Sequence, residues 1–149
     1  MAIDRIDWHY EADGFPDGAP DRQAGAHIGF FLAWAFSRGF AGEGHLEDDG
    51  DELADLAARR ISGTDFLIRM CDGKLWDEDF NEEGAAFAQD YYANHNSAFA
   101  REYGCYLQDY GRVFAEYGDY CVEDGWENFD RLTPLLDERL AQWRRYAAK

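Results

Sequence analysis

Lysine is scarce in this sequence, and long apolar runs are absent. The only lysines are Lys74 and Lys149, and 14 basic residues stand against 31 acidic ones, which gives a formal net charge of −17 at pH 7. Because nucleic acids and anionic membranes bind clustered Lys and Arg, this balance excludes nucleic-acid and membrane partners. A membrane-spanning helix needs about 20 consecutive apolar residues, and the sequence contains no such run.

Cysteine is also rare. The three cysteines, Cys71, Cys105 and Cys121, cannot all pair with one another, and their spacing matches no zinc motif. Residues 1–7 lack the basic and then apolar pattern of a secretory leader. We therefore expect a protein of the reducing cytoplasm.

The motifs of common catalytic and metal-binding sites are missing. Asp77, Asp79 and Asn81 alternate as in an EF-hand loop, but Glu82 and Ala88 occupy the places that need a glycine and a bidentate glutamate. The sequence has neither a nucleophile elbow nor a glycine-rich phosphate loop. It therefore predicts no catalytic residue, no metal ligand and no cofactor.

The four histidines, His9, His27, His45 and His95, are scattered through the chain without the close spacing of a local metal motif. Such scatter leaves open a metal site assembled by the fold. His27 lies in an apolar segment beside Phe30, which predicts a buried and hydrogen-bonded core histidine.

Aromatic residues are abundant, at 17% of the 149 residues, and the hydrophobic fraction is 46%. A chain of this length and composition can bury a core of its own. We therefore expect a single domain over residues 1–149, mostly α-helical, with an irregular arm at 1–23. Prolines and glycines in the arm predict an ordered coil or a short strand around residues 8–10, and we expect Trp8 and Phe15 to pin the arm to the helical body.

Apolar residues recur at helical spacing in the rest of the chain. The helix expected at 21–39 is apolar on most sides, which predicts that it forms the centre of the core. Ser62 or Thr64 is expected to cap a helix, and Thr133 is expected to begin the last helix ahead of Pro134. The predicted helices lie near 21–39, 53–60, 64–70, 82–91, 106–117 and 134–147.

Tyrosines are concentrated between residues 91 and 120. Tyr106, Tyr110 and Tyr117 share one helical stripe, which predicts that they belong to the core. Tyr92 and Tyr103 are the better candidates for an interface, because tyrosine is common among the residues that dominate binding.

Six segments carry a family resemblance: HIGFFLAW at 27–34, CDGK at 71–74, EDFNEEG at 78–84, the pair Tyr91-Tyr92, the stretch 122–129 with its WENF ending, and 136–139. Together they resemble an uncharacterised family of small acidic bacterial proteins. The resemblance runs from about residue 8 onward and implies no activity and no catalytic residue. In size and acidity, members of that family resemble the immunity proteins that accompany bacterial toxins.

We therefore expect an acidic cytoplasmic protein-binding domain, plausibly an immunity protein that neutralises a cognate toxin by covering a basic surface. A binding protein is favoured over an enzyme. Two alternatives stay open: a hydrolase with a carboxylate or histidine site assembled by the fold, and a housekeeping subunit of a homo-oligomer. The residues expected to bind the partner are Asp48, Asp49, Asp51, Glu52, Asp77, Glu78, Asp79, Glu82, Glu83 and Tyr92.

Overall fold

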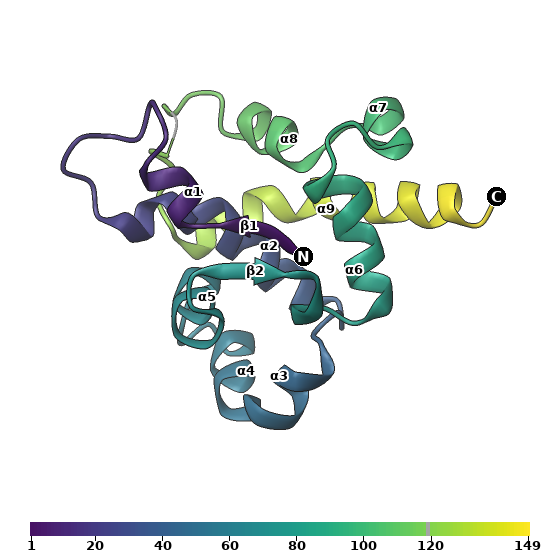
Figure 1. Ribbon diagram of the computed structural model, residues 1–149, viewed down its shortest axis with the longest axis horizontal. Coiled ribbons are helices and arrows are strands. Elements are labelled where there is room, and N and C mark those ends of the chain that lie inside the picture. Colours follow the sequence, from purple (N-terminus) through teal and green to yellow (C-terminus); the bar gives the residue numbers. More distant parts are fainter. Residues whose placement is uncertain (119) are drawn as a thin grey trace.

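The computed structural model describes residues 1–118 and 120–149 and is mostly α-helical, with a small two-stranded sheet (Figure 1). The predicted fold class is therefore confirmed. Among the described residues, no helix combines the length and the apolar character needed to pass through a bilayer. The elements in chain order are β1 (Ala2–Arg5), α1 (Asp7–Tyr10), η1 (Asp21–Gly25), α2 (Ala26–Ser37), α3 (Glu43–Asp48), α4 (Gly50–Ala57), α5 (Gly63–Cys71), β2 (Lys74–Trp76), η2 (Asp77–Asp79), α6 (Glu82–Ala88), η3 (Gln89–Ala93), α7 (Ala98–Tyr103), α8 (Tyr106–Val113) and α9 (Trp126–Ala147).

Helix α2 is the centre of the core, as its apolar residues predict. Every residue from Ala26 to Ala35 is buried. In Figure 1, α2 lies between an upper group of helices, with α7 and α8, and a lower group, with α3, α4 and α5. A helix covered on all sides must be apolar on all sides, which explains why this segment has no polar face.

Helices α2 and α5 approach closely because glycines lie at their contact. A Cβ atom added to Gly63 would lie 1.9 Å from the carbonyl oxygen of Gly29, and one added to Gly29 would lie 2.4 Å from the backbone nitrogen of Thr64. Ser62 caps α5: its hydroxyl accepts from the amide of Asp65, whose carboxylate accepts from the amide of Ser62. Of the two expected caps, Ser62 is therefore the one used.

The N-terminal arm is more regular than the sequence suggests. The strand lies at Ala2–Arg5, where it pairs antiparallel with β2, and residues 8–10 belong to the short helix α1. The expected coil or short strand around 8–10 is therefore wrong, since these residues are helical, and Trp8, at 52% exposed, does not pin the arm. The register shifts between Ala2 and Asp4, and Ile3 and Asp4 are both buried. This register shift is typical of a β-bulge. It occurs where two consecutive side chains are buried, so the carboxylate of Asp4 lies in the interior.

The two C-terminal helices have other bounds than expected. Helix α9 begins after Gly125, and Pro134 lies inside it. A proline cannot donate to the carbonyl four residues earlier; here the hydroxyl of Thr133 donates to that carbonyl, the one of Asp130, at 3.4 Å. Helix α8 ends at Val113, so Tyr117 lies beyond it and is 44% exposed, in contrast to its predicted core position.

Candidate functional site

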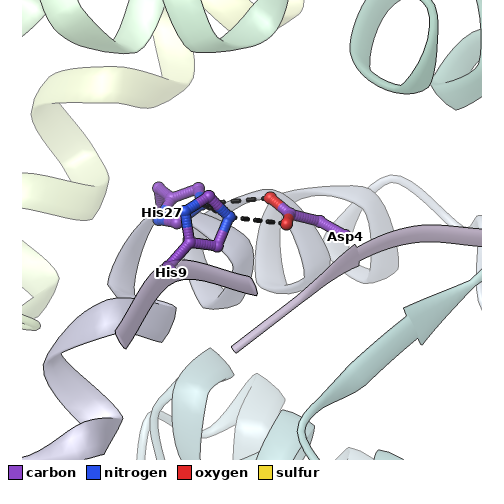
Figure 2. A group of neighbouring side chains, drawn as sticks. All are labelled: Asp4, His9 and His27. Atoms are coloured by element: carbon purple, nitrogen blue, oxygen red, sulfur yellow. Dashed lines mark hydrogen bonds and ion pairs between the residues drawn. The ribbon is translucent and has the colours of Figure 1, made fainter. Parts of the chain in front are cut away.

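Three ionisable side chains from the N-terminal third of the chain converge inside the protein (Figure 2). Asp4 lies on β1, His9 on α1 and His27 on α2. The distance from His9 Nε2 to Asp4 Oδ1 is 2.6 Å, from His27 Nε2 to Asp4 Oδ2 it is 3.1 Å, and between the two Nε2 atoms it is 3.3 Å. We call Asp4, His9 and His27 the first cluster.

The protonation states of the first cluster follow from its burial and its hydrogen bonds. Burial opposes ionisation of Asp4, which is 3% exposed, but the hydrogen bonds from His27 and His9 outweigh this effect and hold the pKa of the carboxyl well below its usual range. Burial lowers the pKa of His27 in spite of the attraction of Asp4. At neutral pH the cluster therefore contains an ionised carboxylate and a neutral His27 imidazole.

The hydroxyl groups of two tyrosines contact the first cluster at hydrogen-bond distance. The hydroxyl of Tyr92 donates to Asp4 Oδ2, and the hydroxyl of Tyr120 lies 2.7 Å from His9 Nδ1. Tyr92 lies on η3, a π-helical turn, a form often found at functional sites. Tyr92 is 5% exposed, so it does not lie on a surface where a partner could contact it, which corrects the expectation that it belongs to a docking surface.

Tyr120 is held in an unusual backbone conformation. Its φ of 61° lies in the left-handed region that residues other than glycine seldom adopt. The side-chain amide of Gln23 donates to the carbonyl oxygens of Tyr120, at 2.8 Å, and Val122, at 3.0 Å. Gln23 on η1 thus holds the segment that carries the Tyr120 hydroxyl toward His9.

The two histidines of the first cluster lie in the wall of a pocket of about 490 Å³. This volume is within the range of small-molecule sites. Asp4 does not line the pocket, whereas His9, His27 and Gln23 form a polar part of its wall. The rest of the wall is mostly apolar or aromatic and includes Leu107, Tyr110, Phe114, Tyr117, Tyr120 and Val122.

The first cluster has the donor set and the spacing of a metal site. Two imidazole nitrogens and one carboxylate oxygen are a common ligand set for zinc and for non-haem iron. Ligand atoms about 2.0–2.2 Å from one ion lie roughly 2.9–3.5 Å from each other. The two Nε2 atoms lie 3.3 Å apart, and each faces a different oxygen of Asp4, His9 at 2.6 Å and His27 at 3.1 Å. One ligand atom from each of the three residues can be chosen so that all lie within 4.8 Å of one another.

A second cluster of polar side chains is formed around His45 on helix α3, and it contains two of the acids that were expected to bind a partner. The imidazole of His45 on α3 bonds Asp49 Oδ2 through Nδ1 and Asp79 Oδ1 through Nε2, both at 2.7 Å. The Sγ atom of Cys71, at the end of α5, lies 3.8 Å from His45 Nε2 and 3.7 Å from Asp79 Oδ1. We call His45, Cys71 and Asp79, with Asp49 behind the imidazole, the second cluster.

The charges of the second cluster depend on one another. The hydrogen bond to Asp79 raises the pKa of the His45 imidazole, and the bond to Asp49 adds to it, against an opposing effect of burial. Burial raises the pKa of the Cys71 thiol, and the charge of Asp79 raises it further. The thiol of Cys71 is therefore protonated at neutral pH.

The other acids expected to bind a partner lie near the surface on adjoining elements. Asp48, Asp51, Glu78, Glu82 and Glu83 are exposed, and Glu52 and Asp77 are partly exposed. They belong to α3, α4, η2 and α6; η2 contacts both α3 and α6. Some of these carboxylates form ion pairs with cationic groups of the same chain.

The N-terminal amine lies 2.8 Å from Asp77, and Arg144 lies 2.7 Å from Glu83. Within residues 1–118 and 120–149, no ion pair is formed by Asp48, Asp51, Glu52 or Glu82. Among the residues expected to bind a partner, these four carboxylates are therefore the ones without an ion pair in the described part of the chain.

Sequence reasoning placed one member of the first cluster and missed the others. His27 was expected as a buried, hydrogen-bonded histidine, and the structure confirms this. Asp4 and His9 stood in the arm expected to be irregular, with nothing to show that they face His27. The one signal available was a histidine beside a buried apolar helix, because such a histidine needs a polar partner.

Comparison with known proteins identifies a family but no function. The family model described as a domain of unknown function (DUF7832) matches residues 2–122. Neither a curated protein nor a solved structure shows significant similarity to the chain. The matched range contains every residue of both clusters and ends before α9.

Proposed function

The chain belongs to the family of the domain of unknown function DUF7832, and from that premise we propose that it binds a divalent transition-metal ion at the first cluster and a small molecule in the adjoining pocket. The observation that carries this proposal is the convergence of two imidazole nitrogens and a carboxylate, 2.6–3.3 Å apart, at the wall of a pocket of about 490 Å³.

The protonation of the first cluster suits a metal ion. Metal ligands must be a neutral imidazole or an ionised carboxylate. Low pKa values keep Asp4 ionised and His27 neutral. His9 would hold an ion through the lone pair of Nε2 and carry its hydrogen on Nδ1, which would donate a hydrogen bond to the Tyr120 hydroxyl oxygen 2.7 Å away.

The pocket indicates the class of molecule that would reach the ion. Three protein ligands leave positions on a metal ion for water or a substrate group. Tyr110, Phe114 and Tyr120 supply aromatic wall beside the histidines, which favours a small molecule with an apolar or aromatic part and one group able to bind the ion. An ion held in this way can polarise a carbonyl or acidify bound water, so hydrolysis is the reaction class that the site supports best.

Metal binding by matched histidine variants tests the proposal. The protein is freed of metal by chelation, and the binding of Zn²⁺ and Mn²⁺ is measured by calorimetry for the parent, His27→Gln and His95→Gln. His95 is an exposed histidine outside both clusters, so its variant controls for the loss of any imidazole. We expect the His27 variant to lose one ion per chain and the His95 variant to bind as the parent does. Equal stoichiometry and affinity in all three proteins would refute the proposal.

A second candidate function is the docking of a basic protein, such as a cognate toxin, on the acidic surface. The observation that favours it is the position of Asp48, Asp51, Glu52 and Glu82 on α3, α4 and α6, with no ion pair among the described residues. Uncompensated carboxylates attract a cationic partner and speed its encounter.

Charge reversal tests the docking function. The products of neighbouring genes are assayed for binding to the parent, to the variant with Asp48→Lys and Asp51→Lys, and to a charge-matched control with Asp13→Lys and Asp17→Lys in the exposed arm. We expect complexes that weaken as salt rises and that only the first variant abolishes. Binding that is lost equally in both variants would show a response to net charge and not to this surface.

A further inference from the structure

We propose that the second cluster is a separate zinc site, in which His45 Nε2, Cys71 Sγ and Asp79 Oδ1 are the ligands and Asp49 orients the imidazole. The inference is independent of the proposed function, because the two clusters share no residue.

The distances within the second cluster match the bond lengths of zinc. With a Zn–S bond of about 2.3 Å and Zn–N and Zn–O bonds of about 2.0–2.2 Å, a tetrahedral ion holds sulfur roughly 3.6 Å from its neighbouring ligand atoms. Cys71 Sγ lies 3.8 Å from His45 Nε2 and 3.7 Å from Asp79 Oδ1. The Nε2–Oδ1 distance is 2.7 Å, so these two atoms need only move apart slightly.

The groups behind the ligands hold them in a metal-binding orientation. Asp49 bonds Nδ1, the ring nitrogen that faces away from Cys71 and Asp79. A carboxylate on the far nitrogen of a ligating histidine is a common support of zinc sites. The second oxygen of Asp79, Oδ2, accepts a hydrogen bond from the backbone amide of Trp76 at 2.7 Å. Oδ1 is therefore the oxygen that faces the sulfur of Cys71.

Apolar surroundings and the donor set distinguish this site from the first. The ring of His45 packs against Phe36 and Phe66, with centroids 5.5 and 5.2 Å away. A thiolate favours zinc over the harder ions magnesium and calcium. Zinc would bind as the S–H bond of Cys71 and the N–H bond at His45 Nε2 break and Zn–S and Zn–N bonds form, with both protons released to buffer and no change in oxidation state.

The ligands come from three elements that are separate in the sequence: α3, the end of α5 and η2. An ion bound to all three would fix α3 to the rest of the domain. That role fits a structural site, because the residues lining the 490 Å³ pocket include none of the second cluster. The alternative without a metal is a protonated His45 shared by two carboxylates, with Cys71 as a neighbour only.

Cobalt spectroscopy separates these two descriptions. Metal-free protein is titrated with Co²⁺, whose thiolate-to-cobalt absorption appears only when sulfur is a ligand. The first cluster offers only oxygen and nitrogen, so this band reports the second cluster alone. The proteins compared are the parent, Cys71→Ser, Asp49→Asn, Asp4→Asn, and Cys121→Ser as a control at an exposed cysteine, with circular dichroism as a check that each variant is folded.

We expect the parent, Asp4→Asn and Cys121→Ser to show the band, and Cys71→Ser to lack it. Loss of the supporting carboxylate in Asp49→Asn should weaken cobalt binding roughly 10–100-fold and keep the band. The zinc site is refuted if folded parent protein gives no thiolate band, or if the band persists in Cys71→Ser. Loss of the ion from His27→Gln with the thiolate band intact would concern the first cluster only, so the two proposals can fail separately.

Discussion

Removing the charge of Asp109 should strongly destabilise the protein. Asp109 on α8 is 0% exposed and accepts hydrogen bonds from Arg139 Nε at 2.8 Å, Arg139 Nη2 at 3.1 Å and the hydroxyl of Tyr91 at 2.7 Å. Asp109→Asn keeps the shape but leaves the largely buried Arg139 side chain, 12% exposed, without its carboxylate partner. Breaking a buried ion pair from one side costs about 3–5 kcal/mol, a large part of the usual stability of a domain.

Urea unfolding followed by circular dichroism measures this loss, and the protein supplies its own control. Asp130 pairs with Arg59 at the surface, where an ion pair contributes only about 0–1 kcal/mol. We expect Asp109→Asn to lower the free energy of unfolding by about 3–5 kcal/mol and Asp130→Asn by less than about 1 kcal/mol. If the two variants lose equal stability, the Asp109–Arg139 pair does not hold α8 to α9 as we argue.

The same carboxylate should contribute to unfolding in acid. Burial opposes the ionisation of Asp109, but the hydrogen bonds from Arg139 and Tyr91 outweigh it, so its pKa lies below 3.8 in the folded protein. The stabilisation is therefore fully present above the unfolded pKa and is lost as the pH falls through the folded value. We expect the stability of the parent to decrease more steeply than that of Asp109→Asn as the pH falls below about 4.

Three further outcomes follow from the packing and the metal sites. Gly29→Ala should destabilise the protein by about 1–3 kcal/mol, because the new Cβ would lie 2.4 Å from the backbone nitrogen of Thr64. Gly44→Ala, where the added Cβ meets open space, should stabilise the protein by about 0.4–1 kcal/mol. Urea unfolding of the two variants and the parent measures both effects. Pro134→Ala should stabilise α9 by about 1 kcal/mol or more, because the new amide can donate to the carbonyl of Asp130. Zinc at 100 times its dissociation constant should add about 2.7 kcal/mol, seen as a thermal midpoint that rises with zinc and falls back with a chelator.

The sequence predicts the helical class and the central helix because local apolar periodicity carries both. The Ser62 cap is confirmed for the same reason, since it depends on a few neighbouring residues. The predicted start of the last helix was wrong because proline is a favourable first residue of a helix, which made Pro134 look like a beginning. The hydrogen bond from the Thr133 hydroxyl to the carbonyl of Asp130, which allows Pro134 to lie inside α9, is visible only in three dimensions.

The candidate sites lie beyond such local rules. Asp4 and Tyr92 are 88 residues apart in the chain, and Cys71 meets His45 across 26. Spacing cannot indicate partners at these separations. The acids at 48–52 and 77–83 look alike in sequence, yet the fold turns Asp49 and Asp79 toward His45 and leaves Asp48 and Glu82 exposed.

The pairing of β1 with β2 has a consequence for how the protein is made. Strand β1 leaves the ribosome before its partner, Lys74–Trp76, which follows some 70 residues later; at about 5–20 residues per second this is a delay of roughly 4–14 s. During that time the buried residues Ile3 and Asp4 have no sheet to join. Strand β1 is therefore exposed to chaperones and proteases until β2 has been synthesised.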